Sequence, residues 1–443
     1  MTTTSNTHQH FGEHIRHNID RWTSALEQNG FDSVLVHSGT PMYSFLDDYE
    51  YPFRPNPHFL SWLPLTHHHD SALLIRPGNK PRLCFYQPDD YWYLPPADPE
   101  SWWADHFDIQ TVAGSDDWVG QLRPDITGNT AAIGDSPSLE ALFPQDRINP
   151  ENLVTGIHLQ RTRKTGYEIA CMAEASRLAV LAHHAAENAF MDGRSELEIH
   201  QAYLASCGHT DARLPYHNIV ALNEHGAVLH YQGREATVPG QSRSFLLDAG
   251  CTFNAYCSDI TRTYSRNSGL FADLISEMDQ LQQQLGNRVE AGVDFRDLHL
   301  DTHRGIAGIL SDAGVIRTDA ENAVESGLSS VFYPHGLGHY IGLQTHDVAG
   351  LIDNDGNPSP TPDGHPFLRL TRVLEASNVL TIEPGLYFIE SLLNDWRDNR
   401  DASVINWDLV DSMKPYGGVR IEDNLVVEEG GNRNLTREAF AAL

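Results

Sequence analysis

The 443-residue chain carries 60 Asp and Glu against 30 Lys and Arg, which gives a formal net charge of −30 at pH 7. A field of that sign repels nucleic acid and anionic membrane surfaces, because both require a basic surface for binding. Hydrophobic residues at 40% with 9% aromatics are ordinary for a globular protein, so we expect a folded chain and not an intrinsically disordered one.

The first 150 residues alternate helical and strand patterns. A helix is predicted around 13–29, and β-branched runs predict strands at 32–38, 71–77, 82–87 and 130–135. This alternation indicates a compact α/β domain, which we place at residues 1–160. Because the chain exceeds what one hydrophobic core usually organises, a second domain is expected over residues 161–443.

The expected boundary lies near residues 155–165, where a long helix begins. Thr165 followed by Glu168 has the form of a capping box, in which each side chain satisfies a free amide of the first turn. A helix continuous with the preceding domain is the alternative at this point.

The second domain mixes further helices and strands. Helical periodicity predicts helices at 195–206, 270–287 and 298–312. β-type runs predict strands at 217–222, 244–264, 379–388 and 418–428. The stretch 351–366 is rich in Asp, Asn, Pro and Gly, which predicts an exposed loop.

Cysteine usage and the N-terminal sequence bear on location. The five cysteines are an odd number, widely scattered and without zinc-finger spacing, which is typical of a reducing compartment. The N-terminal stretch lacks the apolar segment of a secretion signal, and the chain has no apolar run of about 18 residues. We therefore expect a cytoplasmic protein without a membrane anchor.

Asp248 and Asp259 lie in SFLLDAGCTFNAYCSDITRTY, a segment that reads as two strands joined by a turn. Paired strands can project two side chains to one face, and two carboxylates there repel each other unless a cation lies between them. Taken alone, the pair is equally consistent with a surface or turn role.

Three histidines, His335, His339 and His346, are interleaved with glycines in VFYPHGLGHYIGLQTHDVAG. Neutral imidazoles are metal ligands, and glycine allows the backbone to approach an ion closely. The alternative is a histidine-bearing loop or a set of core histidines, since the chain has 24 histidines.

Glu383 and Glu422 interrupt apolar strand-like runs, VLTIEPGLYF and GGVRIEDNLVV. A carboxylate buried among such residues requires a counter-charge, which a metal ion can supply. With Asp248, Asp259 and His339 they make four carboxylates and one imidazole, a set that suits Mn²⁺, Co²⁺ or Zn²⁺ in a two-metal hydrolytic centre.

Four segments in this order, DAGCTFNAYCSDITRT, HGLGHYIGLQTHD, TIEPGLYF and GGVRIEDN, resemble the metal-ligand blocks of the pita-bread metallopeptidases of superfamily M24. Within that superfamily the chain is most similar to the prolidase (Xaa-Pro dipeptidase) family, in the bacterial branch that includes organophosphorus acid anhydrolases. HSG, FLDD and FYQPDDYW extend the similarity to the N-terminal part. The resemblance implies an α+β fold, in which a smaller α/β domain of the creatinase N-terminal type precedes a catalytic pita-bread domain.

The resemblance also implies roles for the metal centre. The five residues above would hold two divalent ions per subunit, with Asp259 and Glu422 as bridging ligands. Mn²⁺ is the expected metal, and Co²⁺ and Zn²⁺ are the alternatives. Glu383 is the implied general base. His346 would stabilise the tetrahedral intermediate or transfer a proton, and Arg420 would orient ligands.

Further positions match the family's substrate pocket. His230 and His335 are the implied pocket histidines, and Arg369 matches the position that pairs with the proline carboxylate, for which a planar guanidinium is well suited. The alternatives are structural ion pairs for Arg369 and Arg420 and an ordinary loop role for His230.

The remaining candidates are aromatic or lie in the first domain. Tyr216 and Trp92 are candidates for lining the pocket, although aromatic residues are more often core residues. Asp48 is similar to a residue that reaches the neighbouring subunit's pocket, which implies a homodimer. Ala255 departs from the family pattern, because many relatives have glycine there, and Thr345 replaces a small aliphatic residue.

The implied activity is hydrolysis of Xaa-Pro dipeptides with a C-terminal proline, accompanied by hydrolysis of P–F and P–O organophosphate bonds. One alternative is an aminopeptidase P that acts on longer Xaa-Pro peptides. Another is a pita-bread module that binds peptides without catalysis.

Overall fold

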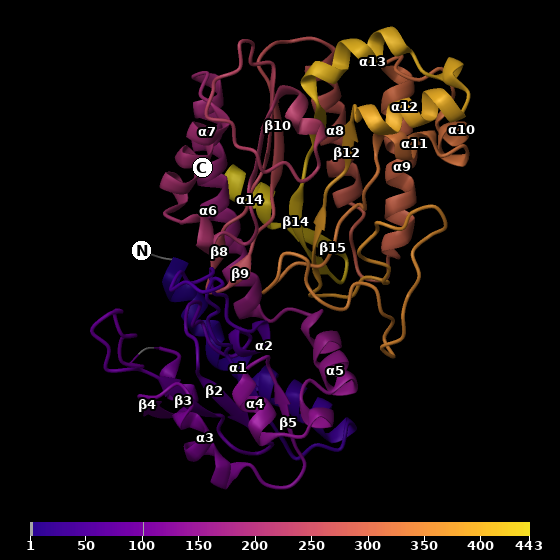
Figure 1. Ribbon diagram of the computed structural model, residues 1–443. Helices are drawn as coiled ribbons and strands as arrows, with labels where there is room; N and C mark the ends of the chain where they lie inside the picture. The colour runs from indigo at the N-terminus through magenta and orange to yellow at the C-terminus, as the bar shows by residue number, and fades with distance from the viewer. Residues whose placement is uncertain (1–2, 101) are drawn as a thin grey trace. The chain divides into compact units, whose positions relative to one another are not determined.

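The computed structural model describes the backbone of residues 3–100 and 102–443 (Figure 1). The chain forms two compact units: an N-terminal unit, Met1–Cys171 with Asn254–Tyr256, and a C-terminal unit, Met172–Phe253 with Cys257–Leu443. The division falls within one long helix, α6 (Gly166–Met191).

The N-terminal unit is built on a five-stranded mixed sheet in the order β4-β3-β2-β1-β5. The central pairs β1–β2 and β2–β3 are antiparallel, while β1–β5 and β3–β4 are parallel. The strands are β1 (Ser33–His37), β2 (Ala72–Ile75), β3 (Arg82–Tyr86), β4 (Asp108–Val112) and β5 (Thr130–Ile133). The helices are α1 (Thr3–Gln28), α2 (Pro57–Leu60), α3 (Asp117–Leu122), α4 (Pro137–Leu142) and α5 (Glu151–Arg161).

The core of this unit follows from the apolar strands. Every residue of β1, β2 and β5 is buried, and Leu35, Leu74 and Ala132 pack against Trp118 of α3 and Leu139 of α4. The four predicted strands are confirmed. β4 was missed because its sequence, DIQTV, carries mostly polar, partly exposed side chains at the sheet edge.

The helix α6 begins as its sequence predicts. The backbone N–H of Thr165 donates to the Glu168 carboxylate at 2.8 Å, and the N–H of Glu168 donates to Thr165 Oγ1 at 3.4 Å, which completes the capping box. α5 ends at Arg161 and α6 begins at Gly166, so the two helices are separate, although the first residues of α6, up to Cys171, belong to the N-terminal unit.

The C-terminal unit contains two three-stranded sheets, β10-β7-β6 and β11-β14-β15, and the pair β12–β13. Its strands, with the short β8 and β9, are β6 (Ile219–Leu222), β7 (Ser244–Asp248), β8 (Thr252–Phe253), β9 (Tyr256–Cys257), β10 (Thr261–Ser265), β11 (Val379–Ile382), β12 (Gly385–Tyr387), β13 (Gly418–Arg420), β14 (Asp423–Glu428) and β15 (Gly431–Asn434). All pairings within these sheets are antiparallel.

Helices pack around these strands, with α8 and α9 in mutual contact (Figure 1). After α6 they are α7 (Glu196–Cys207), α8 (Leu270–Gly286), α9 (Phe295–Asp312), α10 (Ala320–Glu325), α11 (Leu328–Phe332), α12 (Glu390–Asn399), α13 (Trp407–Met413) and α14 (Leu435–Ala441). Apolar residues of α8, α9 and α11 join those of β11 and β14 in one large buried core. Within the described ranges, no helix is both long and apolar enough to cross a bilayer.

Candidate metal centre

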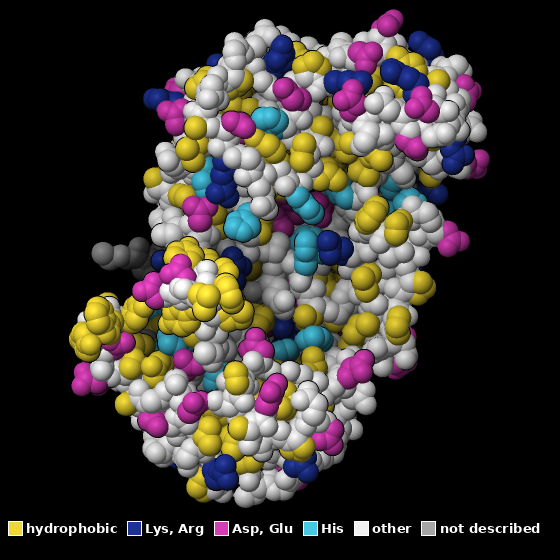
Figure 2. Space-filling model, viewed as in Figure 1, with side chains coloured by type: hydrophobic (Ala, Val, Ile, Leu, Met, Phe, Trp, Pro, Cys, Tyr) yellow, Lys and Arg dark blue, Asp and Glu magenta, His cyan; other side chains and the backbone are white. Residues whose placement is uncertain are grey.

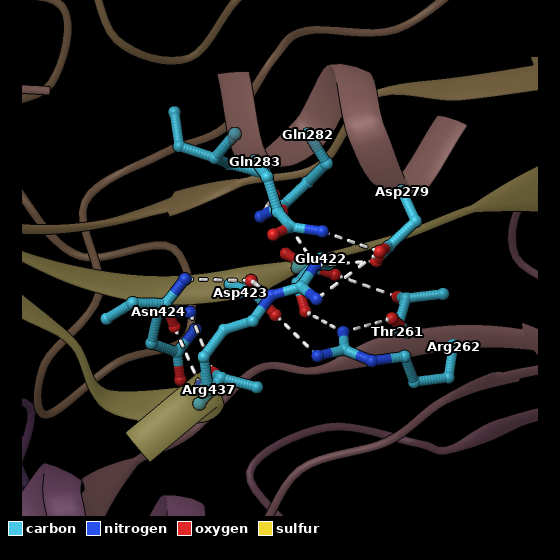
Figure 3. Close-up of polar contacts among 12 residues, drawn as sticks. Thr261, Arg262, Asp279, Gln282, Gln283, Glu422, Asp423, Asn424 and Arg437 are labelled. Carbon is cyan, nitrogen blue, oxygen red and sulfur yellow. Dashed lines mark hydrogen bonds and ion pairs between the residues drawn. The ribbon is translucent and has the colours of Figure 1, made fainter. Parts of the chain in front are cut away.

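Strand register brings the predicted carboxylates of the C-terminal unit together. In the antiparallel pair of β10 and β7, Thr261 lies opposite Asp248. On its other side Thr261 forms an isolated antiparallel bridge with Glu422. The hydroxyl of Thr261 donates to Glu422 Oε2 at 2.9 Å, a contact visible in Figure 3. Asp248 and Glu422 therefore flank one central residue, and Asp259 precedes that residue by two positions.

Glu383 and His339 reach the same place from two other segments. β11 pairs with β14 so that Ile382 lies opposite Asp423, which brings the next residue, Glu383, to the level of Glu422. The N–H of Thr381 donates to the carbonyl of His339 at 2.9 Å. Four segments of the sequence, which lie along the chain from Asp248 to Glu422, 174 positions apart, thus converge.

Distances between side chains define the centre. His339 Nε2 lies 3.5 Å from Asp259 Oδ2 and 3.8 Å from Glu383 Oε1. Asp259, His339 and Glu422 each offer a ligand atom within 4.8 Å of one another, a grouping that could hold a metal ion. We call Asp248, Asp259, His339, Glu383 and Glu422 together the carboxylate centre.

The imidazole of His339 is oriented for ligation. Its Nδ1 lies 3.0 Å from the carbonyl of Tyr340, and because a carbonyl only accepts, Nδ1 carries a proton. The other nitrogen, Nε2, faces the carboxylates. A backbone acceptor behind a histidine ligand is the usual device that fixes the ring and its tautomer.

Buried negative charge dominates the electrostatics of the centre. Burial raises the pKa of Glu422 well above its ordinary value, and the charges of Asp259, Glu383 and Asp248 raise it further. Burial likewise raises the pKa of Glu383, to about 7, despite the opposing effects of His339 and Arg420. Each of these carboxylates is easier to protonate than usual because it lacks sufficient counter-charge.

Two carboxylate oxygens have no hydrogen-bond partner among the described residues: Asp248 Oδ1 and Glu422 Oε1, both buried. An unsatisfied buried oxygen is unfavourable, and a cation would satisfy it. The orphaned oxygens, the excess of carboxylates and the oriented imidazole of His339 all fit divalent metal ions. Divalent metal ions are therefore the cofactor that these residues are suited to hold.

Asp259 is held from both sides. Tyr216 donates its hydroxyl to Asp259 Oδ1 at 2.5 Å, and the side chain of Asn424 exchanges two hydrogen bonds with the Asp259 backbone, at 2.9 and 2.6 Å. Burial raises the pKa of Asp259, but the bonds from His339 and Tyr216 outweigh it and the net pKa is lowered. Tyr216, predicted as a pocket-lining residue, thus contacts a candidate ligand directly.

Arg420 is buried against the same centre. Its guanidinium donates to Asp248 Oδ2 at 2.7 Å, to the hydroxyl of Tyr387 at 2.7 Å and to Thr261 Oγ1 at 3.3 Å. The ring of His335 lies beside it, with Nε2 2.9 Å from the Tyr387 hydroxyl. The sequence analysis assigned no role to Tyr387 or Thr261, although both lie within segments that it singled out.

A second ionic network supports the strand that carries Glu422 (Figure 3). Arg262 and Arg437 both bind the fully buried carboxylate of Asp423 at 2.7 Å, and Arg437 also binds Asp279 at 2.6 Å. The network fixes the residue that follows Glu422. The sequence offered one signal for it, a second acidic residue beside Glu422 at the start of an apolar strand.

The other predicted residues differ in their surroundings. The ring of His346 lies 4.4 Å from that of His339, and burial, His339 and Arg369 together lower the pKa of His346 to about 4. Arg369 and His230 have exposed side chains, and His230 acts electrostatically on both His335 and His346. Figure 2 shows histidine and arginine or lysine side chains gathered on the face in view.

Two predicted residues, Asp48 and Trp92, belong to the N-terminal unit. Both are exposed, Trp92 to 77%. Large exposed hydrophobic residues surround them in sequence, and we call this set the exposed aromatic patch: Met42, Tyr43, Phe45, Leu46, Tyr49, Tyr51, Tyr91, Trp92, Tyr93 and Leu94.

Comparison with known proteins identifies the class. Residues 9–159 match the N-terminal domain of Xaa-Pro dipeptidases, and residues 170–429, more than half of the chain, match metallopeptidase family M24. An Xaa-Pro dipeptidase of Xanthomonas campestris pv. campestris (strain B100) is 47% identical over 435 residues, 98% of each chain. One of Pseudoalteromonas atlantica (strain T6c) is 42% identical over 433 residues, 97% of this chain and 98% of the relative. The chain therefore belongs to metallopeptidase family M24 and, within it, to the Xaa-Pro dipeptidase branch.

Solved structures share the fold. Zinc-substituted Escherichia coli aminopeptidase P in complex with product matches with a TM-score of 0.73 at 22% identity, covering 98% of this chain and 95% of that one. Proline aminopeptidase P II of Yersinia pestis matches with a TM-score of 0.72 at 22% identity, covering 98% and 96%. The predicted fold class, a pita-bread domain preceded by a smaller α/β domain, is confirmed.

Proposed function

We propose that the carboxylate centre hydrolyses the bond before proline in Xaa-Pro dipeptides. The observation that carries the proposal is the convergence of four carboxylates and one oriented imidazole, with two buried carboxylate oxygens left unsatisfied. Relatives 42–47% identical over nearly their full length are Xaa-Pro dipeptidases, which supports the substrate class.

The five residues of the centre would hold two divalent ions, Mn²⁺ being the best match for an oxygen-rich donor set. When bound, such ions polarise a carbonyl and acidify water. The predicted division of labour, with Asp259 and Glu422 as ligands to both ions, is consistent with the burial of both side chains, which are 5% and 2% exposed.

Glu383 is the proposed general base. Its side chain is 19% exposed whereas Glu422 is 2% exposed, so the Glu383 carboxylate is the more accessible of the two for accepting and returning a proton. His346, whose pKa is lowered to about 4, is neutral at pH 7 and can donate a hydrogen bond to developing negative charge on the substrate. Arg420 holds Asp248 in place through its 2.7 Å contact.

Arg369 is the proposed partner of the proline carboxylate. An exposed guanidinium close enough to act on His346 can bind both oxygens of a free carboxylate. The bond before proline has no amide N–H, so recognition of the free carboxylate and of the carbonyl would provide the selectivity. His230 and His335 complete the proposed pocket.

A substrate panel tests the proposal. The purified chain is stripped of metal, restored with Mn²⁺, and assayed on Gly-Pro, Leu-Pro, Gly-Pro-Ala and Gly-Leu. We expect Xaa-Pro dipeptides to be hydrolysed with the highest kcat/KM and the metal-free protein to be inactive. A preference for Gly-Pro-Ala would favour the aminopeptidase P alternative, since the solved structures that share this fold are aminopeptidases P.

We further propose hydrolysis of P–F and P–O organophosphate esters as a side activity. A phosphorus centre under attack resembles the tetrahedral intermediate of peptide hydrolysis, so groups that stabilise one can stabilise the other. Glu383→Gln should abolish both activities together. Loss of dipeptide hydrolysis with full retention of P–F hydrolysis would contradict a shared site.

A homodimer and a cytoplasmic location complete the proposal. The exposed aromatic patch consists of ten large, exposed hydrophobic residues in two short stretches of the chain, which supports self-association, and Figure 2 shows hydrophobic side chains gathered on the face in view. All five cysteines lie in the described part of the chain as buried thiols, which suits a reducing compartment.

A further inference from the structure

A second group of metal-ligating side chains lies apart from the carboxylate centre. His299 and His303 are four residues apart on α9, so they project from one face of the helix. His365, from the loop that follows residue 351, lies against them, with His365 Nδ1 3.1 Å from His299 Nε2. One ring nitrogen from each of the three lies within 4.8 Å of the other two. We call these three residues the histidine cluster.

Two buried nitrogens of this cluster are unsatisfied. His299 Nδ1 and His303 Nε2 have no hydrogen-bond partner in the part of the chain that the structure describes, although both side chains are only 1% exposed. A buried polar atom without a partner is unfavourable, and a metal ion bound at such a nitrogen would satisfy it. Both belong to one group that already has the spacing of a metal site.

The imidazoles are in the state that a metal ion requires. Burial lowers the pKa of His299 to about 3 and that of His303 to about 2, and neighbouring histidines lower both further. The rings are therefore neutral at pH 7. Nδ1 of His303 lies 3.0 Å from Ser329 Oγ, a contact of the kind that fixes a ligating ring.

We propose that His299, His303 and His365 bind one transition-metal ion, with Zn²⁺ as the best match, at a site separate from the carboxylate centre. Three imidazoles without a carboxylate form a nitrogen-only donor set, which favours Zn²⁺ over the oxygen-preferring Mn²⁺. His365 is half-buried, so the site has access to solvent.

The ion would fasten a loop to a helix. His299 and His303 are fixed on α9, whereas His365 lies in the loop 351–366 that the sequence predicts to be exposed. Arg369 follows His365 by four residues. A metal at the histidine cluster would therefore restrain the segment that carries the proposed carboxylate-binding arginine, a consequence that rests on the proposed function, whereas the metal site itself does not.

The test counts zinc in full-length variants. Asp259→Asn removes a ligand of the carboxylate centre, and on that background we compare an intact histidine cluster with His365→Ala. After chelation, incubation with excess Zn²⁺ and desalting, we expect about one zinc ion per chain in the first variant and almost none in the second, by plasma mass spectrometry. His184→Ala, which removes a partly exposed histidine of α6, is the matched control and should keep its zinc.

A Co²⁺ titration provides a spectroscopic measure. Co²⁺ at a three-histidine site should give a visible absorption band that disappears in His365→Ala and persists in His184→Ala. His365→Phe keeps an aromatic ring but no nitrogen, and serves if the alanine variant does not fold. Equal zinc content with and without His365 would overturn the proposal and leave a hydrogen-bonded histidine cluster. If Asp259→Asn does not lower the zinc content below that of the natural chain, this result would contradict the carboxylate centre but not the histidine cluster.

Discussion

Arg369 and Arg420 show two uses of a guanidinium group at one site. Arg420 is buried, and each of its three side-chain nitrogens donates a hydrogen bond within the protein, to Thr261, Tyr387 and Asp248. Arg369 is exposed, and its charge lowers the pKa of His346. A buried, occupied arginine positions other groups, whereas an exposed one remains available to a ligand.

Arg369→Ala should weaken substrate binding more than turnover. Loss of a charge-assisted contact of about 2 kcal/mol corresponds to a rise of roughly 30-fold in KM for Gly-Pro. Steady-state kinetics check this, with Arg400→Ala, at an exposed residue directly after α12, as the matched control. An unchanged KM in Arg369→Ala would show that the proline carboxylate is bound elsewhere.

At this scale the candidate metal ligands could be found from the sequence, because a carboxylate in an apolar strand is unusual wherever it occurs. Glu383 and Glu422 are such cases. The histidine cluster could not be found in the same way. His299 and His303 have helical spacing, but His365 lies in a polar loop more than 60 residues away, and no local pattern relates them.

At the scale of elements, the turn between β8 and β9 is strained. Asn254 and Ala255 both have positive φ, 48° and 74°. Two-residue turns of this type favour asparagine followed by glycine, because glycine has no Cβ to clash in the left-handed region. Ala255, which stands where many relatives have glycine, is therefore held in a backbone conformation that is unfavourable for a residue with a Cβ.

Ala255→Gly should stabilise the protein by about 1 kcal/mol, since the left-handed conformation costs roughly that much for a residue with a Cβ. Urea unfolding of the metal-loaded protein measures the change. Ala272→Gly, within α8, is the control and should destabilise by a similar amount, because glycine is a poor helix former. A lower free energy of unfolding for both variants would refute strain at Ala255.

The long apolar elements could be predicted from the sequence, but the registers in which the strands pair could not. The strands around Asp248 and Asp259 were predicted to bring these two residues to one face. In the structure Asp248 is paired with Thr261, and Asp259 lies two residues before it. Register depends on the intervening β8 and β9 and on the bridge from Thr261 to Glu422, which joins residues 161 positions apart.

At the scale of the whole molecule, the exposed aromatic patch predicts self-association. Phe45 is 88% exposed, so Phe45→Asp should not disturb the core but should place a charge in an apolar interface. Sedimentation velocity should show a dimer for the natural chain and mainly monomer for this variant. Val238→Asp, at an exposed residue of the C-terminal unit, should remain dimeric. A natural chain that is monomeric at micromolar concentration would contradict the proposed dimer.

Stability of the metal-free protein should fall as pH rises from about 4.5 to 7. Glu383 has a folded pKa of about 7 against an ordinary value of 4.5, mainly because of burial, so the folded state binds the proton more tightly and loses this advantage as the pH increases. The loss is at most about 3 kcal/mol. Asp259, whose pKa is lowered, affects the stability only at a pH below this window.

Urea unfolding at pH 5 and pH 8 with a chelator measures this dependence, and repetition with Mn²⁺ should remove most of it, because the cation replaces the proton as counter-charge. A metal-free protein that is more stable at pH 8 would mean that the carboxylates are already compensated within the fold.

The central claim is that Asp248, Asp259, His339, Glu383 and Glu422 together hold two divalent ions. Anomalous diffraction from crystals grown with Mn²⁺ tests it most directly. We predict two strong manganese peaks about 3.5–4 Å apart, each bound by oxygens of these carboxylates and one also by His339 Nε2. Peaks at other residues, or no bound manganese between these side chains in metal-saturated crystals, would contradict the account.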